Sequence, residues 1–145
     1  MILVVLILIS ILLIVLVERS FVTVGGKFPI ELRNSNIHGR GIFATRDIKC
    51  TEVIEYVPVV LFNRGDVRPD TILLDYDIGH PDGKQATMMF GYGALYNHRN
   101  NHNANWKFVD DKTMAITANR NINKDEEIFA NYGENYWKSR GIEPI

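Results

Sequence analysis

The chain has 145 residues, enough for one domain and little else, and its formal net charge at pH 7 is −1. This near-neutral charge excludes sequence-independent binding to a phosphate backbone, so we expect no direct nucleic-acid binding. The single cysteine, Cys50, excludes an internal disulfide and a zinc site built from cysteines, and it suits a reducing compartment.

The chain begins with an apolar segment, residues 1–17, whose one polar residue is a serine. As a helix this segment spans about 25 Å, slightly short of a ~30 Å hydrocarbon core, and Arg19 can extend it by snorkelling. We predict an N-terminal hydrophobic helix that anchors the chain in a membrane, followed by a tether at 18–27; a cleaved signal peptide is the alternative. Arg19 and Lys27 follow the apolar segment, and no basic side chain precedes it, so the positive-inside rule places the remaining domain in the cytosol. Without the anchor, the protein would be soluble in the cytosol or nucleus.

From residue 28 onward, the sequence predicts many short strands with irregular loops, and therefore a mostly β domain with little helix. Pro58 indicates an edge strand or a bulge where it occurs. Residues 71–89 favour a short helix, which two glycines and a proline interrupt. The predicted strands lie at 29–33, 41–44, 53–62 and 127–131, with a hairpin formed by 106–109 and 113–117.

Three separated segments carry residue types expected of a ligand site. Gly39 and Gly41, in the first, allow a backbone to approach a ligand closely or to take a positive φ. Asn97 and His98, in the second, offer donors and acceptors suited to an adenine edge. The third, 127–137, is dense in aromatic residues, which alone is typical of a core. The second segment's two histidines lack a third ligand or a matching carboxylate, so we expect no metal site.

In order and spacing, these segments resemble the SET domain family of protein lysine methyltransferases over about residues 30–140. Two positions depart from the family pattern: Arg99 stands where a small residue is usual, and His102 where proline is usual. The resemblance is closest to the compact SET proteins of large DNA viruses. The matching residues are Gly39, Gly41, Asn97, His98, Asn103, Glu126, Glu127, Tyr132 and Gly133.

The resemblance implies a SET fold of several small sheets with a knot-like C-terminal segment at 28–140, followed by a tail at 141–145. It also implies S-adenosylmethionine as cofactor and a protein substrate that presents a lysine, with a histone tail as the family's commonest target. The implied cofactor-binding residues are His38, Gly39, Arg40, Gly41, Asn97, His98, Tyr136 and Trp137. The implied substrate channel consists of Tyr76, Trp106, Ala130 and Tyr132, of which Tyr132 and Tyr76 are the implied catalytic residues.

An aromatic channel suits methyl transfer because the attacking lysine must be neutral, although its ordinary pKa is ~10.4. Desolvation disfavours the ammonium form, and the narrow walls fix the direction of approach. Ala130, two residues before Tyr132, predicts room for di- or trimethylation.

The C-terminal end lacks the cysteine-rich zinc segment that closes the channel in many SET proteins. Closure then falls to the short tail, to a second copy of the chain in a homodimer, or to the substrate. The alternative function is a SET-like module that has lost catalysis and binds a peptide or the cofactor.

Overall fold

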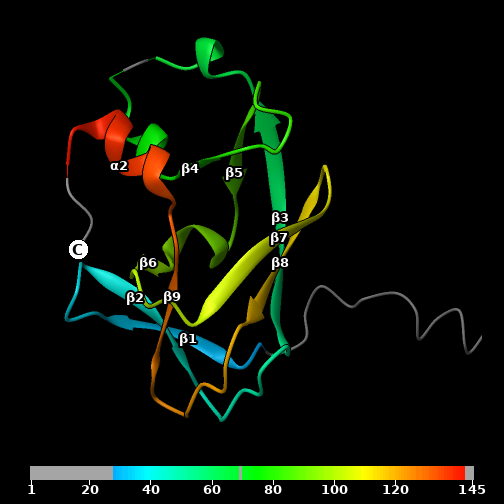
Figure 1. Cartoon of the computed structure of the whole chain (residues 1–145), viewed down its shortest axis with the longest axis vertical. Coiled ribbons are helices and arrows are strands. Elements are labelled where there is room, and N and C mark those ends of the chain that lie inside the picture. Colours follow the sequence, from blue (N-terminus) through cyan, green and yellow to red (C-terminus); the bar gives the residue numbers. More distant parts are fainter. Residues whose placement is uncertain (1–27, 69, 143–145) are drawn as a thin grey trace, which may run out of the picture.

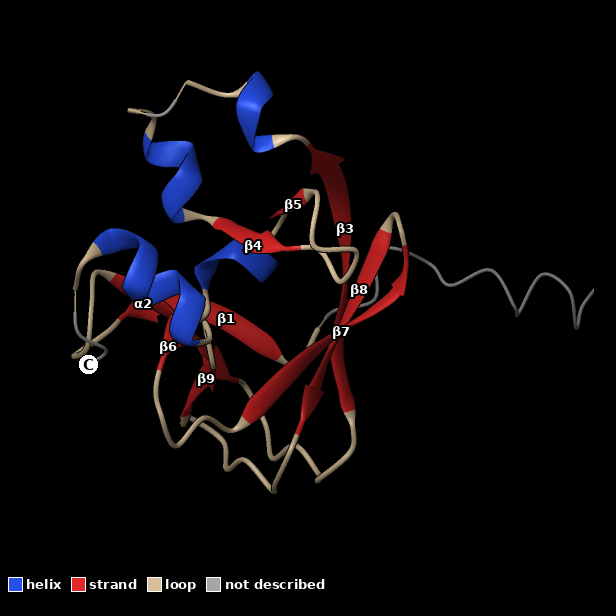
Figure 2. Ribbon diagram, turned by 45° about the horizontal axis from the view of Figure 1, so that its top comes forward, coloured by secondary structure: helices blue, strands red, loops and turns tan. Residues whose placement is uncertain are grey.

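The computed structural model describes residues 28–68 and 70–142, which form two β-sheets and four short helices (Figures 1 and 2). The predicted anchor at 1–17 and the tether at 18–27 lie outside these residues, as does part of the predicted tail. Within the described ranges, no helix has the length and apolar character needed to span a membrane. The expectation of a mostly β domain is confirmed.

The first sheet has four strands in the order β1-β2-β9-β6. β1 and β2 form an antiparallel hairpin, in which the amide of Ser35 donates to the carbonyl of Gly39 at 3.0 Å. β9 lies antiparallel to β2 and parallel to β6. The three segments singled out in the sequence therefore lie side by side in one sheet. Its strands are β1 (Ile30–Asn34), β2 (Arg40–Ala44), β6 (Asn97–His98) and β9 (Glu127–Ala130).

The second sheet is antiparallel and has five strands in the order β4-β5-β3-β8-β7. The predicted 106–117 hairpin is confirmed as β7 and β8, and the predicted 71–89 helix is reduced to one 3₁₀ turn followed by the β4–β5 hairpin. The strands are β3 (Val53–Phe62), β4 (Asp77–Gly79), β5 (Ala86–Met89), β7 (Ala104–Asp110) and β8 (Thr113–Ala118).

The bounds predicted for β3 are confirmed. Of the edge position or bulge predicted from Pro58, the edge position is wrong, and the bulge or irregularity that the strand contains does not lie at Pro58. β3 is the central strand, and its register shift lies between Val53 and Glu55. Pairing with β8 ends at Pro58, and pairing with β5 begins at the next residue. The Pro58 carbonyl accepts from the amide of Phe90, just beyond the end of β5, at 3.0 Å. The N–H that proline lacks would also face β5, at the point where the hydrogen bonds between β3 and β5 end. Pro58 therefore removes few hydrogen bonds between strands.

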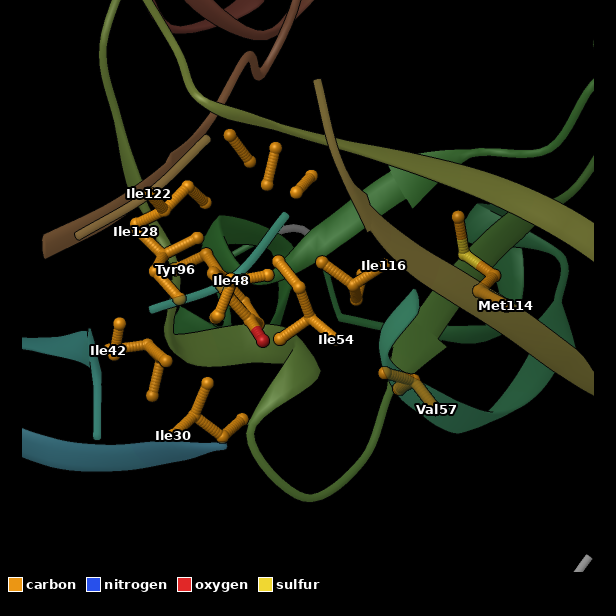
Figure 3. Packing of buried hydrophobic residues seen from close by; sticks show 14 of the residues in the cluster. Ile30, Ile42, Ile48, Ile54, Val57, Tyr96, Met114, Ile116, Ile122 and Ile128 are labelled. Atoms are coloured by element: carbon orange, nitrogen blue, oxygen red, sulfur yellow. The ribbon is translucent and has the colours of Figure 1, made fainter. Parts of the chain in front are cut away.

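The core lies between the two sheets and consists mainly of isoleucines around Tyr96 (Figure 3). Fully burying one such side chain contributes about 1.5–3 kcal/mol relative to leaving it exposed. The cluster draws residues from both sheets and from the bridge between Ile48 and Ile122, so it fixes how the sheets meet.

The helices were under-predicted. A seven-residue helix, α2 (Glu134–Arg140), follows β9, and three 3₁₀ turns are η1 (Arg64–Asp66), η2 (Ile72–Asp75) and η3 (Gly93–Leu95). α2 begins after Gly133 (φ 81°) and ends at Gly141, which takes the left-handed conformation that closes many helices. Its Lys138 pairs with Glu134 one turn earlier at 2.7 Å.

Candidate active site

A cleft of about 530 Å³ opens between α2, η2 and the hairpin loop that joins β1 to β2. Ten of the twelve residues predicted for the site line it. The other two do not: Gly41 lies within β2, and Ala130 is buried in the core cluster. The predicted residues that line the cleft are His38, Gly39, Arg40, Tyr76, Asn97, His98, Trp106, Tyr132, Tyr136 and Trp137.

Asn97 holds the hairpin loop in place. Its side-chain amide donates to the carbonyls of His38 at 3.1 Å and Arg40 at 3.2 Å, and to the Glu127 carboxylate at 2.9 Å. Gly39, between the two carbonyls, has φ +49° and open space beside it. A Cβ at Gly41 would overlap the Glu127 carboxylate, so a larger residue there would break the Glu127–Asn97 bond. The loop backbone at the cleft is therefore set by one buried amide.

His98 holds the backbone of Tyr132. The His98 ring is buried, and its Nδ1 accepts from the Tyr132 amide at 3.1 Å. Nδ1 therefore carries no proton, and Nε2 donates to Asn100 Oδ1 at 3.2 Å. Burial lowers the pKa of His98, which keeps the ring neutral. Both side chains predicted to read an adenine edge are thus engaged in fixing the walls of the cleft.

Tyr132 lies at the centre of an aromatic cluster. Its ring centroid is 4.7 Å from Tyr136, 5.8 Å from Trp137 and 6.1 Å from Trp106. Its hydroxyl donates to the backbone carbonyl of Tyr96 at 2.7 Å. Burial, and then the neighbouring tyrosines, raise the pKa of Tyr132. The phenol is therefore protonated, and its position is fixed at both the hydroxyl and the backbone.

The outer wall of the cleft is joined to α2 by Arg140. Its guanidinium lies 3.7 Å from the ring centroid of Tyr136, bonds to Asp75 Oδ1 at 3.3 Å and also reaches the carbonyl of Leu74. The Tyr136 hydroxyl donates to the Asp75 carbonyl at 3.2 Å. These side-chain contacts attach α2 to η2 across the cleft.

Several residues that shape the site were not found from the sequence. Tyr96, Asp75 and Arg140 line the cleft. Glu127, which the sequence matched to the family motif without a role, supports Asn97 from outside the cleft. Glu55 is buried beneath the cleft, where it accepts from the Tyr96 hydroxyl. Apart from Glu127, only Glu55 carried a signal in the sequence, because it is a charged residue inside the apolar 53–62 strand. The others act through contacts between distant segments, which the sequence does not reveal.

Comparison with known proteins identifies the family. Residues 39–133 match the SET domain. A Schizosaccharomyces pombe histone-lysine N-methyltransferase, H3 lysine-37 specific, is 32% identical over 114 residues, covering 75% of this chain and 76% of that protein. A crystal structure of a Plasmodium falciparum protein described as a histone methyltransferase superimposes with a TM-score of 0.64 at 31% identity, covering 77% of this chain and 98% of that one. The chain belongs to the SET domain family of protein-lysine methyltransferases, as the sequence predicted; the closer likeness to viral members stays a prediction.

The cleft suits the cofactor that this family implies. Its volume lies within the roughly 300–1,000 Å³ range of small-molecule pockets. The buried indole nitrogen of Trp137 lacks a hydrogen-bond partner among the described residues, although buried donors are usually satisfied. The open backbone at Gly39 adds a wall that a ligand can approach closely.

Proposed function

We propose that this protein transfers a methyl group from S-adenosylmethionine to a lysine side chain of a histone. The observation that carries the proposal is Tyr132, a protonated phenol fixed by Tyr96 and His98 among the aromatic rings of the cleft. The membership in the SET family supports the reaction class. The two similar proteins described above, both of them histone methyltransferases by description, support the substrate class.

The cofactor would be held by the wall that Asn97 organises. The backbone of His38–Arg40 forms one side, the Asn97–His98 strand forms the floor, and Tyr136 and Trp137 offer ring faces and the unpaired indole donor. Bound there, S-adenosylmethionine would supply a methyl group on a sulfonium, and its S–C bond would break to leave a neutral thioether as the methyl group forms a bond to a neutral amine.

The lysine would enter between Tyr76, Trp106 and Tyr132. These aromatic walls exclude water and so disfavour the ammonium form, lowering the cost of presenting a free lone pair. The Tyr132 hydroxyl, directed by the Tyr96 carbonyl, orients the nitrogen. We assign catalysis to Tyr132, with Tyr76 shaping the entrance from its exposed position after η2. α2 would close the channel in place of a cysteine-rich segment.

We also propose that the product is di- or trimethyllysine. Ala130, from which the sequence predicted this room, is packed in the core and does not line the cleft. The space for further methyl groups would lie beside Tyr132, between Trp106 and Tyr76. Mass spectrometry of the modified lysine under excess cofactor tests it, and a product that stops at one methyl group would contradict it.

Radiolabelled methyl transfer tests the proposed function. The full-length chain is incubated with methyl-labelled S-adenosylmethionine and recombinant histones, and the labelled residue is identified by mass spectrometry. We expect label on histone lysine, and none with Tyr132→Phe. Cofactor binding by the wild-type chain without label on any histone or other protein would instead favour the alternative, a SET-like module that has lost catalysis.

A further inference from the structure

The side chain of Tyr96 makes a buried polar contact that the core does not require. Tyr96 is 1% exposed and Glu55 is 3% exposed, and the phenol donates to the Glu55 carboxyl at 2.7 Å. The ring lies within the isoleucine cluster (Figure 3). Burial raises the pKa of Glu55 to about 7, which shows how unfavourable a charge is at this position. An apolar pair of the same size would avoid this cost, so the contact calls for a reason beyond stability.

The same residue touches the proposed catalytic centre through its backbone. The Tyr96 carbonyl accepts the hydroxyl of Tyr132 at 2.7 Å. Tyr96 also directly precedes Asn97, the residue that holds the hairpin loop. The position of one residue in the core thus sets both the direction of the Tyr132 hydroxyl and the start of strand β6.

We propose that Glu55 is a positioning residue for methyl transfer. By holding the phenol of Tyr96, its carboxyl fixes the Tyr96 carbonyl and, through that carbonyl, the hydroxyl of Tyr132. Glu55 lies on β3, the central strand of the second sheet, and Tyr96 directly precedes β6 of the first sheet. Their hydrogen bond therefore connects the second sheet to the part of the first sheet that forms the proposed site. The inference rests on the proposed function, because it assumes that Tyr132 orients the lysine.

Three variants separate positioning from folding. Tyr96→Phe removes the donor, Glu55→Leu removes the acceptor with little change of size, and Glu55→Gln keeps an uncharged acceptor. Ile54→Val is the matched control, since Ile54 is a neighbouring core residue with no polar contact. We expect Tyr96→Phe and Glu55→Leu to lower kcat by about ten- to a hundredfold through displacement of the Tyr132 hydroxyl, with a smaller rise in cofactor Kd because Tyr96 directly precedes Asn97. Glu55→Gln should retain more turnover than Glu55→Leu, and the double variant should be no worse than either single one.

A second readout does not depend on turnover. With ¹³C-labelled tyrosine in the full-length chain, the ring signal of Tyr132 is assigned from its loss in Tyr132→Phe. We expect this signal to shift in Tyr96→Phe and Glu55→Leu, and to stay in place in Ile54→Val. The positioning role is refuted if kcat in Tyr96→Phe and Glu55→Leu falls only in step with the melting temperature, as in Ile54→Val, and the Tyr132 signal does not move in these variants. If the wild-type chain transfers no methyl group, the proposed function fails, and the Tyr132 signal still decides whether Glu55 positions this hydroxyl.

Discussion

The two walls of the cleft are built differently. The inner wall, made by β2, β6, β9 and the 38–40 loop, is held by buried amide and imidazole groups that bond to backbone atoms. The outer wall, made by η2, β4 and α2, is joined mainly through Arg140, which pairs with Asp75, 59% exposed at its side chain, and lies 3.8 Å from the buried carboxylate of Asp77. Buried bonds to the backbone fix geometry, whereas exposed ion pairs contribute little and rearrange easily. The comparison predicts that the 38–40 loop and β6 form a rigid wall, whereas α2, which carries Tyr136 and Trp137, adjusts more easily.

The largest effect on turnover is expected at Tyr132, where the two walls meet. Tyr132→Phe keeps the ring stacking but removes the hydroxyl that bonds to Tyr96. We expect kcat to fall by about a hundredfold or more, because the attacking nitrogen loses its orienting group. Steady-state assays measure this, with circular dichroism to confirm folding. Near-full turnover would remove Tyr132 from catalysis. Tyr136→Phe, which loses the hydroxyl that donates to the Asp75 carbonyl on the outer wall, is the matched comparison and should lose less.

The pH dependence of stability tests how firmly the inner wall is supported. The pKa of Glu55 is about 7 in the folded protein against 4.5 ordinarily, because burial disfavours its charge. Between these values the folded state binds more protons than the unfolded chain, so stability falls as pH rises from 5 to 8. The loss is at most about 3 kcal/mol, and Glu55→Gln should abolish it.

Urea unfolding at several pH values measures this loss, and Glu52→Gln is the control. The pKa of Glu52 is lowered by Arg46, so its contribution has the opposite sign and is lost only as pH falls. The decline between pH 5 and 8 should therefore persist in that variant. A flat wild-type profile over this range would contradict the assignment.

Asn97→Ala tests the rigidity of the cofactor side directly. The substitution leaves the carbonyls of His38 and Arg40 without their donor, at a cost of about 1–3 kcal/mol in stability or binding. We expect a weaker cofactor affinity by calorimetry. Asn36→Ala, at an exposed position of the same hairpin, should change nothing. Equal cofactor affinities of Asn97→Ala and Asn36→Ala would show that the 38–40 loop does not need the hydrogen bonds of Asn97.

The smallest effect is expected on the outer wall. Arg140→Gln removes the ion pair with the partly exposed Asp75 and a 3.8 Å contact with the buried carboxylate of Asp77, which keeps Arg64 as its partner, so it should cost about 1 kcal/mol in stability. Because α2 would then be less firmly attached to η2, and because α2 carries Tyr136 and Trp137, we expect a higher KM for the lysine substrate and a smaller rise in cofactor Kd. Lys138→Ala, on the same helix and paired with Glu134 within it, is the control. Unchanged KM and cofactor Kd with Arg140→Gln would show that this attachment does not shape the site.

The same difference between the walls explains what the sequence revealed. Six of the nine strands were predictable because their residues alternate or are β-branched, as in β3, whereas the short β4, β5 and β6 were missed. α2 was missed because seven residues with adjacent aromatics do not display a helical period. Asn97 and His98 were identified, but not their function, since the contact of Asn97 with Glu127 joins residues 30 positions apart. The pairing of Tyr96 with Glu55, 41 positions apart, was not predictable, although a charged residue in the apolar 53–62 strand marked one of the two partners.

The place of β9 has a consequence for synthesis of the chain. β9 lies between β2 and β6, which precede it by many residues, so the first sheet stays split until the ribosome has released nearly the whole protein. Until then β2 is paired only with β1, and its other edge, which carries Ile42, stays unpaired in the nascent chain and invites misassociation. Pairing over such sequence separations also slows folding. A premature stop before residue 127 should therefore abolish cofactor binding and leave an aggregation-prone fragment, although most of the cleft-lining residues have already been made.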